Sequence, residues 1–509
     1  MKKIFISFLC VIMVMVFMPT MVFAAEEPMS EKDFRDALQK GEVDLEGATV
    51  TLNDVISLAD SREYTVKNGT IAMSESYENT DPNNKVIAVQ GNGTILNLEN
   101  VTVIAASANR GAIYVGNGGE LTATDLTVDN SKSDKGAIII NNNANAYFNG
   151  KLDLKLGSES WYGINVDGAK ADFAGVDEFK SDGTGTQSAV CLDSETGYKG
   201  QATGLTLTQV DTEDGQTAYV PGDNLAQFVA AKDAEEGKNV ETITLNEDVT
   251  LTANLYLQAD TNVVGNGKAI NGSAAIRKDN VVTVMGKNVS IENVTIRTCD
   301  ANKSALHVYT TTGTVLKDVT LDASQTVGGA GMVVNSSTVT VEGELNLITG
   351  ENTWGGINVD TKYGGSKVTF ADGSSVALDG NKDVPAIYQD SNDEQTTDAE
   401  VEGAEEAGLV QNADGSYAVK EEVTEDPGQN PGTGENPGTG ENPADDEKNP
   451  VDDQKPVDEE KTDDEGTVTP NTDVEKTADA NDMLPWLALM AVMAIGVVLT
   501  AVKSKKREN

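Results

Sequence analysis

The chain is poor in several residue types, and each shortage excludes a class of function. Its 509 residues include one histidine, three cysteines and 37 basic side chains against 82 acidic ones, for a formal net charge of −45. Nucleic-acid binding needs a basic surface that releases counterions, so nucleic acid is excluded as a partner. One histidine and three cysteines are too few for a His-rich metal centre, a disulfide scaffold or a structural zinc site.

Both ends of the chain carry the pattern of targeting segments. Two lysines and an apolar run that ends in small residues predict a secretory signal peptide over 1–24. Near the other end, Leu484–Val502 is a run of 19 uncharged residues, long enough to span a bilayer, and basic residues follow it. We therefore predict a transmembrane helix over 483–502, a cytoplasmic basic tail over 503–509 and a body outside the cell.

A segment of different composition precedes this span. Residues 421–480 contain seven prolines and 20 acidic residues against four lysines, with no aromatic residue. Such a segment cannot bury enough apolar surface to offset the entropy lost on ordering. It predicts a disordered acidic stalk over 421–482.

The order of stalk, apolar span and basic tail resembles the sorting signal of Gram-positive surface proteins that sortase anchors. In that family a Leu-Pro-x-Thr-Gly-like motif is cleaved after its threonine and joined to peptidoglycan. The corresponding stretch here is degenerate, with Thr477 matching the threonine and Ala478 in place of the glycine. The resemblance implies a cell-surface location, by covalent attachment to peptidoglycan or by retention in the membrane.

The body between signal peptide and stalk contains an internal duplication. Glu99–Val103 recurs as Glu292–Ile296, and Trp161–Asp167 recurs as Trp354–Asp360, both shifted by 193 residues. The shared shift predicts that one structural unit occurs twice.

We place the two units at 25–220 and 221–420. Each begins with a short amphipathic segment, Glu31–Gln39 in the first and Leu225–Ala231 in the second, which predicts a helix that covers the end of a stack. The predicted N-caps are Ser30 and Asn224.

Within each unit a shorter period fixes the fold. Ala112, Ala137, Gly163 and Ala189 are spaced by 25, 26 and 26 residues, and the aliphatic residues after them alternate. Three short strands per coil, repeating at this period, are typical of a parallel β-helix with coils about 4.8 Å apart. A leucine-rich repeat or a β-propeller is disfavoured, because its framework residues and blade spacing are absent. Asparagine and aspartate tolerate left-handed backbone geometry. We expect it at the bends formed by Asn100, Asp125, Asn293 and Asp318.

With these coils, residues 30–395 resemble the right-handed β-helix of the pectin-lyase-like superfamily. The predicted fold class is all-β, with two tandem right-handed parallel β-helix units, each with an N-terminal capping helix. Enzymes of that superfamily use a Gly-His-Gly and an Arg-x-Lys with acidic pairs, or Ca²⁺-binding aspartates with a basic residue. His307, Arg277 and Arg297 lie outside such frames, and we interpret His307 as an outward surface residue. We predict no catalytic residue, metal site or cofactor, and no sequence motif supports Ca²⁺ binding.

Acidic residues at the turns leave one route to catalysis. Paired carboxylates about 5 to 9 Å apart can cleave a glycosidic bond. The acids in question, which capping of turns also explains, are Asp125, Asp129, Asp318 and Asp322.

A repeated cluster of aromatic and polar residues is the candidate binding site. Its members are Trp161, Asn165 and Asp167 in the first unit and Trp354, Asn358 and Asp360 in the second. An aromatic face beside amide and carboxylate groups can hold a sugar ring. The structural alternative is that each tryptophan fills a corner between coils and each aspartate caps the following turn.

The sequence as a whole predicts an adhesive or structural protein anchored at the cell surface. Its predicted partners are extracellular glycans or surface proteins of a host or community, together with the membrane and peptidoglycan at the anchor. The alternatives are a surface polysaccharide lyase or glycoside hydrolase on the same fold, and a passive spacer.

Overall fold

The computed structural model describes most of the predicted body. Contacts divide the chain after Thr424, and the residues before that point form one compact unit. The two buried hydrophobic clusters of the described residues lie within it, so a fragment of residues 25–420 contains the complete described fold. The predicted signal peptide, stalk, transmembrane helix and tail, with Thr477 and Ala478, lie outside the described residues. The described residues are 29–79, 84–183, 186–235, 237–360, 365–390 and 399–420.

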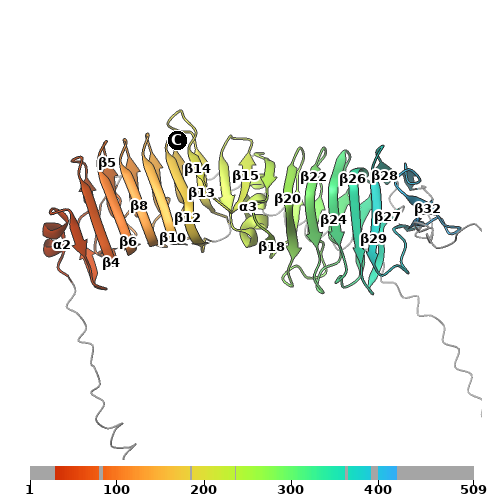
Figure 1. The fold of residues 1–509 in the computed structure, drawn as a ribbon, viewed down its shortest axis with the longest axis horizontal. Coiled ribbons are helices and arrows are strands. Elements are labelled where there is room, and N and C mark those ends of the chain that lie inside the picture. Colours follow the sequence, from red (N-terminus) through yellow and green to blue (C-terminus); the bar gives the residue numbers. More distant parts are fainter. Residues whose placement is uncertain are drawn as a thin grey trace, which may run out of the picture. The chain divides into compact units, whose positions relative to one another are not determined.

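The described chain winds into a right-handed solenoid of about 13 turns, in which strands of successive coils pair in parallel. Figure 1 shows these strands side by side in chain order. The first sheet comprises β1 (Glu42–Asp44), β2 (Thr49–Leu52), β4 (Glu63–Met73), β6 (Ile95–Ile104), β8 (Glu120–Asn130), β10 (Asn145–Leu156), β12 (Lys170–Ser181) and β14 (Gln201–Thr203). A second face of the same coils comprises β3 (Ile56–Leu58), β5 (Ile87–Gln90), β7 (Ile113–Gly116), β9 (Ile138–Asn141), β11 (Tyr162–Asp167) and β13 (Ser188–Asp193).

The second half of the chain repeats this arrangement. One ladder comprises β18 (Val249–Leu251), β20 (Asn262–Gly272), β22 (Ser290–Arg297), β24 (Thr314–Asp322), β26 (Thr338–Thr349), β28 (Lys367–Phe370), β29 (Ser375–Gly380) and β31 (Glu400–Glu402). The other comprises β19 (Leu255–Leu257), β21 (Val282–Val284), β23 (Leu306–Tyr309), β25 (Gly329–Asn335), β27 (Thr353–Asp360), β30 (Ile387–Asp390), β32 (Leu409–Gln411) and β33 (Tyr417–Val419).

The coil period predicted from the sequence is confirmed by the strand register. Ile113 pairs with Ile138, Ile138 with Ile164 and Ile164 with Val190, each one coil further on. All four side chains are fully buried. The aliphatic column is therefore the inside of the solenoid, and the residues between them line its outer face.

The prediction of three separate strands per coil is wrong in most coils, because two of the three join. In β6 the buried Leu98 and Val101 lie in one continuous strand, with Asn100 between them at φ 55°. A single left-handed residue bends the strand without ending its ladder of hydrogen bonds. The predicted bend residues are confirmed, at φ 54° for Asp125, 49° for Asn293 and 52° for Asp318.

Two helices were predicted at unit starts, and both form. In α2 (Glu31–Leu38) the Ser30 side chain accepts a hydrogen bond from the Asp33 amide at 3.1 Å, the predicted N-cap. In α3 (Leu225–Ala234) Asn224 occupies the cap position without a side-chain cap bond. This helix extends three residues beyond its predicted end.

The middle of the chain departs from simple stacking. Here β15 (Thr208–Thr212), β16 (Thr217–Val220) and β17 (Val240–Thr244) pair antiparallel before the parallel coils resume, and η1 (Gly222–Asn224) leads into α3. The buried side chains form two clusters, one from Phe34 to Leu192 and one from Val210 to Leu409. Hydrogen-bonded pairing nevertheless continues from β13 through β16 and β15 to β17. Two separate units are therefore not confirmed: two cores share one continuous ladder.

The acidic residues singled out as a potential catalytic pair all have structural hydrogen-bond partners. Asp125 accepts a hydrogen bond from the Lys151 amide at 2.9 Å, and Asp318 accepts one from the Glu344 amide at 3.0 Å. Asp129 and Asp322 each accept bonds from the amide and hydroxyl of the serine two residues on. Asp125 and Asp318 thus join neighbouring coils, whereas Asp129 and Asp322 cap local turns, and Asp322 also pairs with Arg297 at 2.9 Å.

Candidate functional site: a groove on the outer face of the first coils

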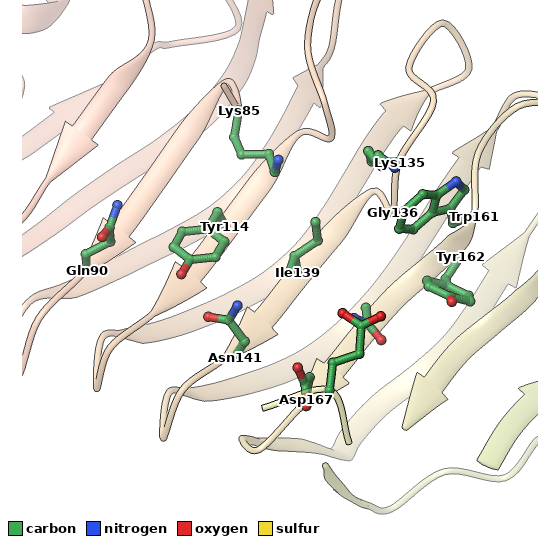
Figure 2. A pocket seen from close by; sticks show the side chains of 12 residues that line it. Lys85, Gln90, Tyr114, Lys135, Gly136, Ile139, Asn141, Trp161, Tyr162 and Asp167 are labelled. Carbon is green, nitrogen blue, oxygen red and sulfur yellow. The ribbon is translucent and has the colours of Figure 1, made fainter. Parts of the chain in front are cut away.

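A groove of about 350 Å³ runs over the outer face of β5, β7, β9 and β11. Its volume lies in the range of small-molecule binding sites. Figure 2 shows the side chains that line it, most of which come from neighbouring coils. The groove contains all three residues of the first predicted cluster. Its lining is Lys85, Gln90, Tyr114, Lys135, Gly136, Ile139, Asn141, Trp161, Tyr162, Asn165, Asp167 and Glu195.

Trp161 is the most exposed aromatic residue of this lining. Its side chain is 53% exposed, so it does not fill a corner between coils as the structural alternative required. The Lys135 ammonium lies over the indole, 2.9 Å from the ring centroid, and Tyr162 meets the ring edge-on at 6.3 Å. Burial, together with the nearby Arg110, lowers the pKa of Lys135. The exposed surface of the indole is available to stack on a ligand.

Tyr114 adds a second aromatic surface, and a glycine makes room for it. The Tyr114 ring lies so close to Gly116 that a methyl group on the glycine would clash with the hydroxyl and the ring. Tyr114 pairs across the ladder with Ile139, and Ile139 with Asn165. These three side chains form the floor of the groove on successive coils.

Two amide oxygens in the groove lack hydrogen-bond partners. They are Oδ1 of Asn141 and Oδ1 of Asn165, both shielded from bulk water and without a partner in the described part of the chain. An unpaired buried acceptor costs about 1–3 kcal/mol. A ligand hydroxyl that displaced the atoms covering these oxygens and donated hydrogen bonds to them would remove that cost.

The carboxylate of Asp167 is already engaged. It accepts hydrogen bonds from the Thr196 amide, at 3.0 and 3.1 Å to its two oxygens, and from the Thr196 hydroxyl at 2.8 Å. The structural alternative expected it to cap the turn that follows it, whereas its bonds go to a loop one coil further on. Asp167 therefore holds the 193–199 loop beside the groove, which brings the exposed Glu195 into the lining.

The second predicted cluster is closed rather than open. Asn358 and Asp360 are each 1% exposed, and Trp354 is partly buried. The Asp360 carboxylate accepts a hydrogen bond from the side-chain amide nitrogen of Asn335 at 2.8 Å. Neither side-chain polar atom of Asn358 has a partner in the described residues. The duplicated sequence thus forms an accessible groove in one half and a buried polar cluster in the other.

His307 occupies the position equivalent to Tyr114. It lies on the outer face as predicted, but it is partly buried, with Nδ1 3.3 Å from the Asn280 amide and its ring 5.3 Å from that of Tyr309. Burial lowers the pKa of His307 to about 4, against a hydrogen bond with Asn335 that acts in the opposite direction. The imidazole is neutral at physiological pH.

Sequence reasoning found the tryptophan and its partners but missed several residues of the groove. Asn141 and Asn335 are equivalent in the two halves, since they pair with Asp167 and Asp360. The duplication contained this signal, because an asparagine precedes each aspartate by one coil. Lys135, three residues before Ile138 as Trp161 is before Ile164, was also predictable from the coil period.

Among the described residues, no group of three histidine, cysteine or acidic side chains is placed to hold a metal ion. No helix in the described part of the chain is both long and apolar enough to cross a bilayer.

Comparison with known proteins gives limited information. No protein-family profile matches the chain, and no curated protein matches its sequence. Among solved structures, the catalytic domain of a GH87 alpha-1,3-glucanase in complex with tetrasaccharides is similar over 74% of this chain and 67% of that chain, with 12% identity and a TM-score of 0.24. The Streptococcus pneumoniae surface protein and adhesin PfbA is similar over 74% of this chain and 100% of that chain, with 10% identity and a TM-score of 0.20. Similarity this low carries no argument about function, and the fold assignment rests on the strand pairing.

Proposed function

We propose that the chain is a cell-surface protein whose first coils bind an extracellular glycan in the groove around Trp161. The observation that carries this proposal is the combination of an exposed indole with two unpaired amide oxygens on one face of the solenoid. The aromatic surface fits the apolar side of a sugar ring, and the amide oxygens accept hydrogen bonds from its hydroxyl groups.

The parallel coils suit a repeating ligand. Equivalent positions recur about every 4.8 Å along the groove, so neighbouring coils present side chains at regular intervals, although their chemistry differs from coil to coil. Lys135 covers part of the indole and sits beside Glu195, which gives the rim both a cation and an anion. Such a rim binds polar groups of either sign without requiring a charged glycan.

The cell-surface location rests on the sequence beyond the described residues. A signal peptide over 1–24, a stalk over 421–482 and a span over 483–502 would hold the β-helical body outside the cell. This proposal includes two alternative modes of attachment. One is anchoring to peptidoglycan through the degenerate signal at Thr477 and Ala478, and the other is retention in the membrane alone. A second class of proposed binding partner is the surface proteins of a host or of neighbouring cells in the community.

Glycan cleavage is the second candidate function, and one observation favours it. Two carboxylates, those of Asp167 and Glu195, line the same groove. A hydrolase needs one carboxyl group as acid and another as base or nucleophile. Asp167 is held by three hydrogen bonds from Thr196, which suits a structural carboxylate, so we place binding ahead of cleavage.

A glycan array with the fragment of residues 25–420 tests the proposal. We expect the wild-type fragment to bind a defined set of glycans and Trp161→Ala to lose that binding while keeping its circular dichroism spectrum. Val327→Ala, at an exposed residue of the second half, is the control and retains binding. Absence of binding to every glycan overturns the proposal, and new reducing ends or unsaturated products on incubation favour the enzyme.

A further inference from the structure

A second hollow lies directly beside the groove, on the other side of Trp161. It has a volume of about 420 Å³ and lies between the coil ends around β13, the antiparallel strands at the middle of the chain, and helix α3. Trp161, Tyr162 and Glu195 line both hollows. The two hollows therefore adjoin, with an exposed indole at their boundary.

Helix α3 supplies one wall of this hollow. Phe228 is buried in the core of the second half, whereas Ala231, Lys232 and Glu235 follow it along the lining. Lys232 forms an ion pair with Glu235 at 3.2 Å and lies 5.9 Å from the Phe228 ring. The helix was expected only to cover the end of a stack. It also places a charged pair and small side chains opposite the coils of the first half.

The opposite wall is polar and chemically inert. Gln216, Thr212 and Ser188 contribute an amide and two hydroxyl groups. Cys191 lies among them, but burial raises the pKa of its thiol to about 12, so it stays protonated and acts as a small side chain. Amide, hydroxyl and ion-pair groups around a small apolar floor match the hydroxyl-rich surface of a sugar chain.

We propose that this hollow is a second subsite of the same groove, and that the ligand is an oligosaccharide long enough to cross Trp161 and reach α3. The inference rests on the proposed function, since it extends the glycan-binding groove. From β5 to β13 the lining spans four coil steps, or about 19 Å, which exceeds the length of any single sugar ring. A duplicated chain would thus use the helix that opens its second copy to lengthen the binding site of its first.

Binding of oligosaccharides of increasing length tests this subsite. Calorimetry would use the fragment of residues 25–420 with the cello-, chito- and galacturonic-acid series, each from disaccharide to hexasaccharide. For a series that binds, we expect affinity to rise with length in the wild type. Ala231→Leu, which fills the hollow, and Gln216→Ala, which removes an amide, are each expected to weaken hexasaccharide binding by about fivefold and leave disaccharide binding unchanged.

A neighbouring alanine provides the matched control. Ala230 lies on the same helix, is exposed and is not part of the lining, so Ala230→Leu should bind every length as the wild type does. Asn165→Ala, in the first hollow, should weaken all lengths. If Asn165→Ala weakens binding but Ala231→Leu and Gln216→Ala have no length-dependent effect, the second subsite is overturned and the proposed function stands. If the wild type binds no member of these series and no glycan of the array, both are overturned.

Discussion

The two halves of the solenoid contain the same Asn–Asn–Asp arrangement but use it differently. In the first half Asn165 has Cys191 as its neighbour on the next coil, whereas in the second Asn358 has Tyr388. Two residues after Tyr114 the first half has Gly116, and the second has Tyr309 at the equivalent place after His307. Where glycine and cysteine flank the arrangement it stays open, and where two tyrosines flank it the polar groups are buried. The two halves thus differ both in access to the arrangement and in the side chains on adjacent coils.

The largest difference expected between the halves concerns their separate cores. Phe173 stacks on Phe148 at 5.0 Å in the first cluster, and Phe370 is buried in the second. Phe173→Ala and Phe370→Ala should each cost about 3–5 kcal/mol in the free energy of unfolding. Because coils contact only their neighbours, we expect faster amide exchange mainly in the half that carries the substitution. Equal acceleration in both halves would show that the two clusters unfold as one.

The next effect concerns glycan binding by the two tryptophans. Trp161→Ala should weaken binding at least about tenfold, because it removes the exposed stacking surface. Trp354→Ala should leave the affinity unchanged and lower the thermal midpoint instead, since its side chain is partly buried. Titration calorimetry and thermal unfolding of both variants measure this. Loss of binding in Trp354→Ala would contradict the assignment of the site to the first half.

Much of this contrast was predictable, and part of it was not. The spacing of Ala112, Ala137, Gly163 and Ala189 predicted the coils, because inward aliphatic residues must recur at the coil period. The repeated Trp161 and Trp354 segments predicted two equivalent sites. Their difference depends on which side chains lie one coil away and how large they are, and this requires the register of the whole ladder.

The boundaries of strands and helices were harder to predict for a similar reason. Asn100 was placed correctly at a bend, but a bend that preserves the ladder does not end a strand. Helix α3 extends past Ala231 to Ala234. Its buried residues contact the core of the second half, and other residues of the same helix line the hollow beside Trp161, so it has no single polar face. Local periodicity predicts the ends of a helix that buries one side, and it therefore predicts the end of α3 poorly.

A smaller effect is expected from replacing Asn165 and Asn358, which are equivalent in the two halves. Both polar atoms of the Asn358 side chain are buried and have no partner among the described residues, so Asn358→Leu should stabilise the chain by about 1–2 kcal/mol. Asn165→Leu should weaken glycan binding and stabilise the chain less than Asn358→Leu does, because only Oδ1 of Asn165 is buried without a partner in the described residues. Urea unfolding of both variants makes the comparison. Destabilisation by Asn358→Leu of more than about 1 kcal/mol would contradict an unpaired amide.

The smallest effect is a pH dependence confined to the second half. The pKa of His307 is lowered to about 4 from an ordinary value of 6.5, so the unfolded chain takes up this proton first as the pH falls. Stability from His307 is therefore complete above pH 6.5 and is lost between 6.5 and about 4. Because the ring is partly exposed, we expect a loss of only about 1 kcal/mol.

Replacing the histidine with the residue of the first half isolates this contribution. His307→Tyr should remove the loss, which would appear as a smaller difference in unfolding free energy between the two ends of that pH range. Tyr114→Phe, on the first half, serves as the control and keeps the wild-type dependence. An unchanged pH dependence in His307→Tyr would contradict a neutral, desolvated imidazole.

The central claim is that the open groove of the first half is the glycan site. A crystal structure of the fragment of residues 25–420, soaked with the hexasaccharide of the series that binds, tests it most directly. The account predicts sugar rings against Trp161, with hydroxyl groups within hydrogen-bond distance of Asn141 and Asn165. Sugar density over the second half, with none beside Trp161, would contradict it.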